Sequence, residues 1–199
     1  MDDWQRILKR GEDIVAGSLL LLVTLPLFPI IALAIKLDSP GPVVFRQRRS
    51  GRNQSPFDVF KFRTMTVQHE TGEAQQATAG DPRITRVGQI LRRTSLDELP
   101  QLINVLKGEM SLVGPRPHLA EHDERFAAIV DTYPHRHQVK PGLTGLAQVS
   151  GFRGETRTRD SVEGRVAADL NYVRNWSLWL DAKIIARTFI AVASGRNAY

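Results

Sequence analysis

The longest apolar run in the chain covers residues 14–35 and contains no charged side chain. A straight helix of roughly 22 residues is about 33 Å long, which is enough to cross the hydrocarbon core of a bilayer. Pro26 and Pro29 lie within the run and are expected to break the helix, because proline lacks a backbone N–H. The same prolines argue against a buried core helix. A signal peptide is disfavoured because no small-residue cleavage site follows.

Basic side chains flank this apolar run on both sides, which does not fit a simple span under the positive-inside rule. Those flanking residues are Arg6, Lys9 and Arg10 before the run and Lys36, Arg46, Arg48, Arg49 and Arg52 after it. A proline-broken re-entrant membrane helix, which enters and leaves the same leaflet, keeps both flanks cytoplasmic. The hydroxyl of Thr24 is expected to supply a partner for the broken backbone.

Two short runs rich in strand-forming residues follow, at 43–45 and 57–60. Residues 50–53 between them have the composition of a turn, so the pattern predicts a small β-hairpin. If the second strand continues, alternation places the side chains of Lys61 and Arg63 on the same face.

Leucine and isoleucine recur at helical spacing from residue 96 to residue 106, which predicts one apolar helix face. Ser95 has the chemistry of an N-cap, and Glu98 three residues later completes a capping-box pattern. Gly108 is a plausible stop. This arrangement places Asp97 and Glu98 in the first helical turn.

Further helices are predicted at 85–93, 119–130 and 161–176, with Asp169 inside the third. The last apolar segment, 176–192, is interrupted by Lys183 and Arg187 and is therefore not expected to span a membrane. Its tryptophans and basic residues favour an interfacial helix, with an ordinary amphipathic core helix as the alternative. Residues 135–137, His-Arg-His, are interpreted as a solvated strand edge, because no third ligand with metal-site spacing accompanies them.

These elements predict a mainly helical α+β fold. Residues 1–36 would form the re-entrant membrane helix. Residues 37–199 would form a cytosolic domain with a small β-hairpin and interfacial amphipathic helices.

Composition narrows the chemistry. The 199 residues include no cysteine, which excludes disulfides, thiolate zinc sites and a cysteine nucleophile. The net charge is +6. A basic balance suits phosphates, nucleic acid or an anionic membrane surface, and does not choose among them.

The strongest chemical signal lies in residues 92–117, where arginines surround the Asp97–Glu98 pair. Arg92 and Arg93 precede the pair, and Arg116 stands between two prolines. Acidic residues often simply stabilise a first helical turn. Arginines around a helix N-terminus instead predict a phosphate site, and the carboxylates suggest a metal-bridged phosphate with one carboxylate free to act as a nucleophile. The helix dipole and the arginines are expected to lower the pKa of Asp97.

Five segments together resemble the bacterial sugar transferases, also called monotopic phosphoglycosyl transferases, in the order found in that family. The segments are Lys61-Phe62-Arg63-Thr64-Met65, Asp81-Pro82-Arg83-Ile84-Thr85, residues 92–117, Lys140-Pro141-Gly142-Leu143-Thr144-Gly145 and Asp169-Leu170-Asn171-Tyr172-Val173-Arg174-Asn175. The family often has a serine before the re-entrant proline, where this chain has Leu25. Larger members carry further N-terminal membrane helices and an extra domain, so this chain corresponds to a short form or to a catalytic part.

The resemblance implies an enzyme that moves a sugar 1-phosphate from a UDP-sugar to polyprenyl (undecaprenyl) phosphate and releases UMP. This would be the first membrane step of polysaccharide or glycoconjugate synthesis. It implies Mg²⁺ as cofactor, membrane lipids and a second copy of the chain as partners, no nucleic acid, and a monotopic protein of the bacterial inner membrane with a cytoplasmic active site. The C-terminal part looks like the branch that uses hexose 1-phosphates.

The resemblance also assigns roles to matching residues. Asp97 matches the nucleophile, which would form a phosphosugar-aspartyl intermediate, and Glu98 matches its partner carboxylate, which would help to hold the metal. The remaining candidates for phosphate or substrate binding are Arg92, Arg116, Lys61, Arg153 and Asp169.

Two other functions compete with a transferase. A membrane-anchored basic module that binds nucleic acid or phosphate without catalysis is disfavoured, because the basic residues cluster beside acidic residues and prolines. A glycoside hydrolase using Asp97 and Glu98 is weaker still, because adjacent helix positions point about 100° apart and do not readily flank a glycosidic bond.

Overall fold

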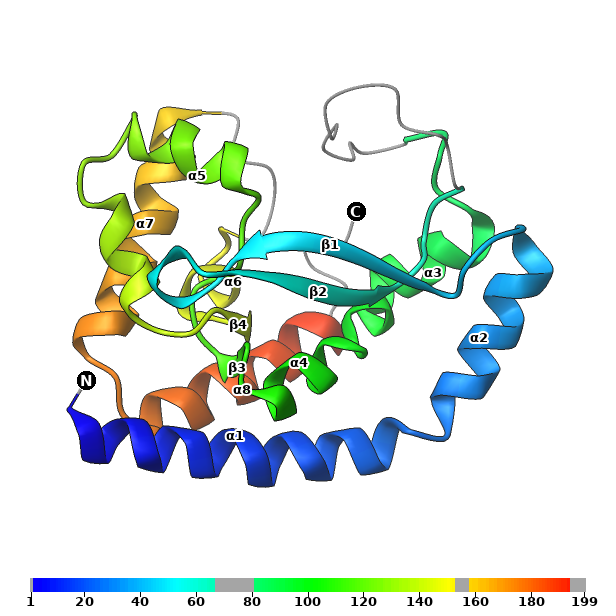
Figure 1. Cartoon of the computed structure of the whole chain (residues 1–199), viewed down its shortest axis with the longest axis horizontal. Helices are drawn as coiled ribbons and strands as arrows, with labels where there is room; N and C mark the ends of the chain where they lie inside the picture. The colour runs from blue at the N-terminus through cyan, green and yellow to red at the C-terminus, as the bar shows by residue number, and fades with distance from the viewer. Residues whose placement is uncertain (1, 67–80, 153–157, 194–199) are drawn as a thin grey trace.

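The computed structural model describes residues 2–66, 81–152 and 158–193 (Figure 1). Its helices are α1 (Asp3–Thr24), α2 (Leu27–Asp38), α3 (Arg86–Thr94), α4 (Gln101–Lys107), α5 (Ala120–Ala127), α6 (Leu146–Val149), α7 (Arg159–Arg174) and α8 (Leu178–Ala193). Short 3₁₀ turns are η1 (Arg52–Gln54), η2 (Leu96–Glu98) and η3 (Tyr133–Gln138). Within these residues the strands form two small sheets, which confirms a mainly helical α+β fold.

The predicted apolar run forms two helices that meet at Leu25 and Pro26 with a bend of 57° (Figure 1). No single helix in the described part of the chain is long and apolar enough to cross a membrane, although α1 and α2 meet that requirement as a bent pair. The hydroxyl of Thr24 donates to the carbonyl of Leu20 at 2.8 Å and not to that of Leu22, whose partner would be the missing N–H of Pro26, so the expected role of Thr24 is not confirmed. Pro29 was expected to break the helix and does not, because it lies in the first turn of α2, where no N–H is required.

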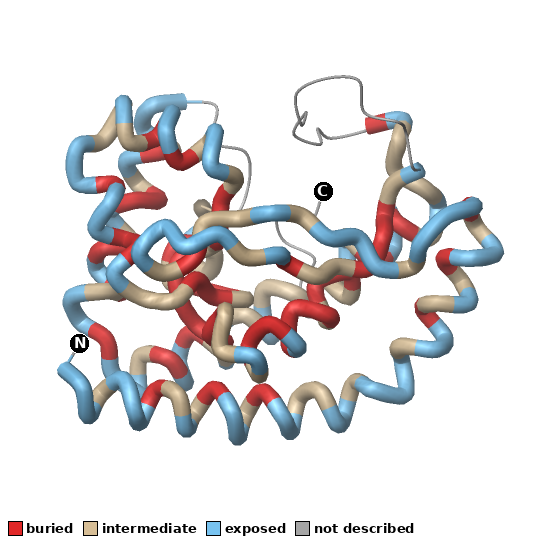
Figure 2. The backbone as a smooth tube through the Cα atoms, viewed as in Figure 1, coloured by how far each residue is buried: buried red, intermediate tan, exposed pale blue. Residues whose placement is uncertain are grey.

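The outer side of this helix pair is apolar and exposed (Figure 2). The large exposed apolar side chains on it are Trp4, Ile7, Leu8, Ile14, Val15, Leu19, Leu22, Val23, Leu25, Leu27, Ile30, Leu33 and Leu37. A contiguous apolar surface of this kind is typical of contact with a membrane or a partner.

A buried ion cluster attaches the first half of α1 to α8 and to strand β3 (Ser111–Val113). Nζ of Lys9 lies 2.6 Å from Asp181, 3.1 Å from Asp13 and 3.2 Å from Glu12. Asp13 also accepts hydrogen bonds from the hydroxyl of Ser111 and from a backbone N–H of β3, both at 2.9 Å. We call this group the Lys9 cluster.

The far end of α2 is held by Arg63, whose guanidinium donates to the backbone carbonyl of Ser39 at 2.7 Å and to its hydroxyl at 3.0 Å. Asp38, the last residue of α2, accepts a hydrogen bond from the N–H of Val87 in α3 at 3.0 Å. Ile31 and Ile35 of α2 pack with Phe62 and Leu91 in a small core. Both ends of the bent pair are therefore attached to the rest of the fold.

The predicted hairpin is confirmed and is longer than the two apolar runs. Strands β1 (Val44–Ser50) and β2 (Pro56–Phe62) pair antiparallel, with Phe45 opposite Lys61 and Arg49 opposite Phe57. The turn contains η1, in which Asn53 has a φ of 52°. Asparagine tolerates this left-handed conformation better than most residues.

A second sheet was not predicted. Strand β3 pairs in parallel with β4 (Gly142–Thr144). Each strand has three residues, too few for an alternation pattern to show. Both belong to the main core, whose buried apolar members are Val59, Leu102, Val105, Met110, Leu112, Val113, Tyr172, Trp176 and Ile184.

The C-terminal segment forms a helix, while its contact with a membrane interface stays a prediction. Trp176 is buried before α8, and its indole N–H donates to Asp181 at 3.0 Å. Trp179 is 78% exposed on α8, together with Phe189 and Ile190, while Ile184 on the same helix is buried. One tryptophan is therefore a core residue, and α8 combines a core face with an exposed apolar face.

The interpretation of residues 135–137 as a solvated strand edge is wrong. They form part of η3, where Arg136 and His137 are buried. Arg136 makes its ion pair with Asp169 of α7, which lies far from it in sequence, so local alternation could not reveal this environment.

Candidate active site

A change of direction between α3 and α4 sets the positions of the two candidate carboxylates. Ser95 adopts a left-handed conformation with a φ of 59°, η2 follows, and α4 begins only after Pro100. The prediction that Ser95 caps a single helix is therefore wrong: its side chain makes no cap hydrogen bond, because the predicted first turn is a separate 3₁₀ turn. The predicted stop is confirmed, since Gly108 ends α4 with a φ of 85°. Asp97 and Glu98 lie in the tight turn, each only 8% exposed.

Two cations contact the carboxylate of Glu98. Nζ of Lys61, from β2, lies 3.1 Å from Oε1. The guanidinium of Arg116 makes a fork, with Nη2 at 2.6 Å from Oε1 and Nη1 at 3.4 Å from Oε2. We call this group the Glu98 cluster; it joins the hairpin, the turn η2 and the segment after β3.

The backbone of Arg116 is fixed by a second buried ion pair. Asp169 accepts hydrogen bonds from Nε of Arg136 at 3.0 Å and from Nη2 at 2.9 Å. The same Nη2 donates to the backbone carbonyl of Arg116 at 2.6 Å. Asp169 therefore does not contact the Glu98 cluster directly; it orients Arg136, which holds the chain between Pro115 and Pro117.

The cations around Glu98 are desolvated. Burial and the neighbouring Arg116 lower the pKa of Arg49 to about 10, and burial also lowers the pKa of Lys61 although Glu98 opposes the shift. The carboxylate of Glu98 raises the pKa of Arg116. Arg49 was not among the predicted site residues. The register of the hairpin could have identified Arg49, since it places the side chain of Arg49 on the same face of the sheet as that of Lys61.

Asp97 differs from its neighbour. Among the described residues no side chain or backbone N–H donates a hydrogen bond to its carboxylate. Burial and the adjacent charge of Glu98 raise the pKa of Asp97 to about 6, against the opposing effects of Lys61, Arg116 and Arg92. The expectation of a lowered pKa is therefore wrong: the carboxylate is buried beside a like charge, and the nearby cations are engaged by Glu98.

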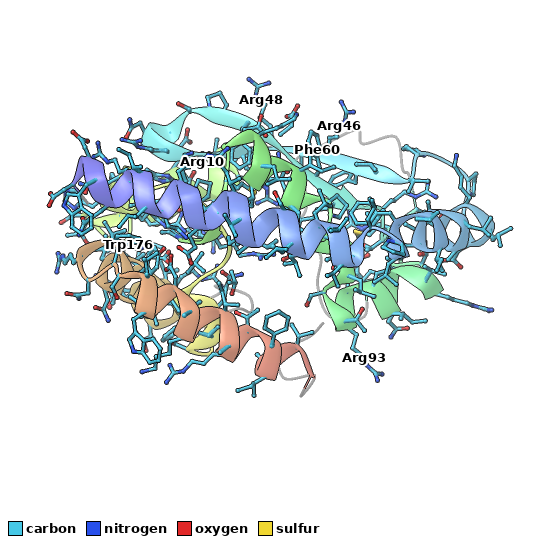
Figure 3. All side chains as sticks on the ribbon, turned by 90° about the horizontal axis from the view of Figure 1, so that it is seen from below. Arg10, Arg46, Arg48, Phe60, Arg93 and Trp176 are labelled. Carbon is cyan, nitrogen blue, oxygen red and sulfur yellow. The ribbon has the colours of Figure 1, made fainter. Side chains whose placement is uncertain are left out.

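The remaining predicted residues lie in different places. Arg92, in the last turn of α3, donates from Nε to the hydroxyl of Thr64 at 3.1 Å and acts on Asp97 through its charge. Arg93 is exposed and points outward (Figure 3). Arg153 lies outside the described residues. The structure thus brings together Asp97, Glu98, Lys61 and Arg116, with Arg92 close to them and Asp169 behind them.

The carboxylates of Asp97 and Glu98 are candidate ligands for Mg²⁺. In the described part of the chain no group of three or more acidic, histidine or cysteine side chains has metal-binding geometry. Mg²⁺ commonly keeps several waters and takes only one or two carboxylates plus substrate phosphates, so the Asp97–Glu98 pair fits this ion when a diphosphate is present. Both oxygens of Glu98 already accept hydrogen bonds from Arg116, so a metal at Glu98 would share this carboxylate with a cation.

Comparison with known proteins covers nearly the whole chain. Residues 4–195 match the family described as bacterial sugar transferase. The chain is 53% identical over 98% of its length to the UDP-glucose:undecaprenyl-phosphate glucose-1-phosphate transferase of Escherichia coli (strain K12). It is 52% identical over 96% of its length to a protein of the same name from Caulobacter vibrioides.

A third relative is named for a different sugar. It is the UDP-N-acetylgalactosamine-undecaprenyl-phosphate N-acetylgalactosaminephosphotransferase of Aeromonas hydrophila, 42% identical over 96% of this chain. The chain spans 42% of the length of the Escherichia coli relative, 72% of the Caulobacter relative and 45% of the Aeromonas relative.

Proposed function

The chain belongs to the bacterial sugar transferase family, and from this premise we propose that it transfers a hexose 1-phosphate from a UDP-sugar to undecaprenyl phosphate and releases UMP. The observation that carries the proposal is the pair of unequal carboxylates in one turn. Glu98 is held by Lys61 and Arg116, whereas Asp97 accepts no hydrogen bond from the described residues. A carboxylate without donors, beside an arginine fork, is suited to attack a bound phosphate.

The first step is attack by a carboxylate oxygen of Asp97 on the phosphorus that bears the sugar. A bond forms between this oxygen and phosphorus, and the bond from phosphorus to the bridging oxygen breaks. UMP leaves with that oxygen, and the sugar phosphate stays on Asp97 as a mixed anhydride. The pKa of about 6 leaves Asp97 mainly ionised at neutral pH, and more nucleophilic than a carboxylate of ordinary pKa.

Arg116 has a second partner in this scheme. Its fork is paired with Glu98 in the structure, and the same geometry matches a phosphate. We infer that the diphosphate of the donor draws Arg116 from Glu98, which leaves Glu98 oxygens available. Arg92, in the last turn of α3, adds positive charge near Asp97.

Mg²⁺, held by Glu98 and the donor phosphates, would neutralise charge on the diphosphate and make phosphorus a better electrophile. Two further residues of the chain would position the groups that contact the donor. Lys61 retains its contact with Glu98 and orients it, and Asp169 through Arg136 keeps Arg116 in place.

In the second step a phosphate oxygen of undecaprenyl phosphate attacks the same phosphorus. The bond to Asp97 breaks, the carboxylate is regenerated, and the product is the undecaprenyl diphosphate sugar. A phosphate oxygen is already a competent nucleophile, so no base is needed. A ternary mechanism, in which the lipid attacks the donor directly, is the rival.

The acceptor is a lipid, and the exposed apolar side of the bent helix pair supports a monotopic protein that draws the acceptor from the bilayer. We propose that α1 and α2 form a re-entrant helix with both ends on the cytoplasmic side of the inner membrane. Cysteines introduced singly at Asp3 and Asn53 should both be shielded from a periplasmic thiol reagent. Labelling of either residue from the periplasm contradicts this topology.

The deciding experiment omits the lipid. Protein incubated with Mg²⁺ and each of UDP-glucose, UDP-galactose and UDP-N-acetylgalactosamine should gain the mass of one sugar phosphate with at least one donor and release one equivalent of UMP. Asp97→Asn should give no adduct, while Asp160→Asn, at an exposed position in α7, should behave as the wild type.

Adding undecaprenyl phosphate should then discharge the adduct. An absence of adduct, with intersecting rather than parallel double-reciprocal plots, would leave the ternary route. No UMP release with any donor, together with steeply salt-dependent binding to DNA, would instead favour the binding module.

A further inference from the structure

A cavity separate from the Glu98 cluster lies between the first half of α1 and the β3–β4 sheet. Its volume is about 190 Å³. Its lining is rich in cations, which come from three parts of the chain: Arg6, Lys9 and Arg10 on α1, Arg52 in η1, and Lys140 just before β4. None of the residues of the Glu98 cluster takes part in this lining.

The positive charge of the cavity is not balanced from within. Asp13 is the acidic residue among the lining side chains, and its Oδ1 already accepts hydrogen bonds from β3 and lies 3.1 Å from Lys9. The ammonium of Lys9 is paired with the three carboxylates of the Lys9 cluster. Arg10 donates from Nη1 and Nη2 to two carbonyls near the end of α4, each at 2.7 Å. Figure 3 shows Arg10 beside this helix.

In the described part of the chain neither Lys140 nor Arg52 forms an ion pair. Nζ of Lys140 and the guanidinium of Arg10 converge at Gly108, each 3.4 Å from where a Cβ would stand. Burial and the charges of Arg10 and Arg52 lower the pKa of Lys140, against the opposing effect of Asp13. Nε of Arg52 is buried and has no hydrogen-bond partner in the described part of the chain. Buried donors without partners are costly, so this N–H requires a polar partner, which a bound anion would supply.

We propose that this cavity binds a phosphate group. A tetrahedral dianion or a phosphodiester offers several acceptors to Lys140 and Arg52 at once, and its charge offsets the mutual repulsion of the cations. The volume of the cavity exceeds the roughly 30 Å³ that one water molecule occupies in the liquid, so it has room for such a group.

The surroundings of the cavity suit the phosphate of a lipid headgroup. Ile7 and Leu8, beside Arg6 and Arg10 on α1, are exposed, as is Trp4 one turn earlier. A headgroup phosphate in the cavity would leave its acyl chains against this apolar side. A free phosphate offers the same charge without that contact, so the two sources are separable by experiment. The site is independent of the proposed transfer reaction.

The test uses full-length protein in a neutral detergent and native mass spectrometry. Phosphatidylglycerol, phosphatidylcholine and inorganic phosphate are titrated separately, and inorganic phosphate is also added in competition with phosphatidylglycerol. Four variants each remove one positive charge. Lys140→Gln and Arg52→Gln alter the cavity; Lys183→Gln alters an exposed position on α8, and Arg48→Gln alters an exposed position on β1, where the side chain points outward (Figure 3).

The dissociation constant for the anion should rise about tenfold in Lys140→Gln and in Arg52→Gln, as expected for the loss of one charge-assisted contact. Lys183→Gln and Arg48→Gln should bind as the wild type, and Lys140→Arg should restore binding. Phosphatidylglycerol that inorganic phosphate does not displace identifies a lipid site, whereas displacement identifies a site for free phosphate. Unchanged binding in both cavity variants, or an equal loss in the two controls, overturns the proposal.

Discussion

The Lys9 cluster and the Glu98 cluster are both buried groups of acids and bases, and they differ in which charge is in excess. In the Lys9 cluster one ammonium lies within 3.2 Å of three carboxylates, and backbone and hydroxyl donors complete the shell of Asp13. In the Glu98 cluster two cations share one carboxylate, and the adjacent Asp97 has no donor among the described residues. The first is a closed arrangement that joins helices, while the second leaves one carboxylate available for chemistry.

The two clusters should therefore contribute to different properties: the Lys9 cluster to the stability of the fold and the Glu98 cluster to the rate of the reaction. Breaking a closed buried cluster should cost folding free energy, because a charge remains without its partner. Changing the open cluster should cost rate, because its members act on a ligand. Variants of the two clusters should therefore give opposite patterns of stability and activity.

The largest effect is expected from Lys9→Met. The substitution removes an ammonium that lies near three carboxylates, and should lower the free energy of unfolding by about 3–5 kcal/mol. Denaturant unfolding in detergent measures this value. Lys183→Met, at an exposed position on α8, is the matched control and should unfold as the wild type. Equal unfolding of both variants would show that the Lys9 cluster is not an anchor.

A smaller effect is expected from Asp169→Glu, which keeps the charge and lengthens the side chain. The added methylene displaces Arg136, and with it the backbone of Arg116, so turnover should fall by up to about a hundredfold while the fold is kept. The release of UMP at saturating donor and lipid gives kcat. Asp160→Glu on the same helix provides the control; a normal kcat for Asp169→Glu would mean that the hydrogen bond to Arg116 has no role in positioning.

Arg116→Lys should act directly on the open cluster. Lysine keeps the charge and loses the fork, which removes a charge-assisted contact of about 1.5–3 kcal/mol and should lower kcat/KM about tenfold or more. Arg93→Lys, where the side chain is exposed, should have no effect. If Arg116→Lys turns over normally while its melting temperature falls, Arg116 has a structural role only.

The smallest effect concerns pH. The pKa of Asp97 lies at about 6, above its usual 3.8, so the folded protein protonates this group at a higher pH than a free side chain would. The rate of adduct formation should rise through pH 6 and gain about twofold from pH 6 to pH 8, because half of the carboxylate is ionised when pH equals pKa. Rapid-quench mass spectrometry of the adduct measures this rate.

Glu98→Gln sharpens the same comparison. It removes the adjacent negative charge and frees Lys61 and Arg116, so the midpoint should move to lower pH although the rate at the plateau falls. A midpoint that stays at pH 6 would show that Glu98 does not set the pKa of Asp97.

Much of the fold could be predicted, because its longer elements have clear patterns. The hairpin, α3, α5 and α7 follow from periodicity and turn residues, and the bend at Pro26 follows from the missing N–H. Strands β3 and β4 could not be predicted, since a three-residue strand paired through space has no local signature. Pro29 was misinterpreted because the first turn of a helix accepts proline.

The candidate site was predicted as a set of residue types but not as an arrangement. The pairing of Arg116 with Glu98, and of Asp169 with Arg136, depends on contacts between residues more than 15 positions apart. The pKa of Asp97 was predicted with the wrong sign because the sequence shows neither the burial of Asp97 nor the engagement of the nearby cations by Glu98. Lys61 was identified through the resemblance, while its partner became clear only from the structure.

Lys61 and Arg63 are two residues apart, and this spacing has a mechanical consequence. Two steps of an extended chain measure about 7 Å. Over that length the chain connects the Asp97–Glu98 turn, through Lys61, with the end of the apolar helix pair, through Arg63. We therefore expect a tilt of α2 to be passed to the Asp97–Glu98 turn through only two residues of polypeptide.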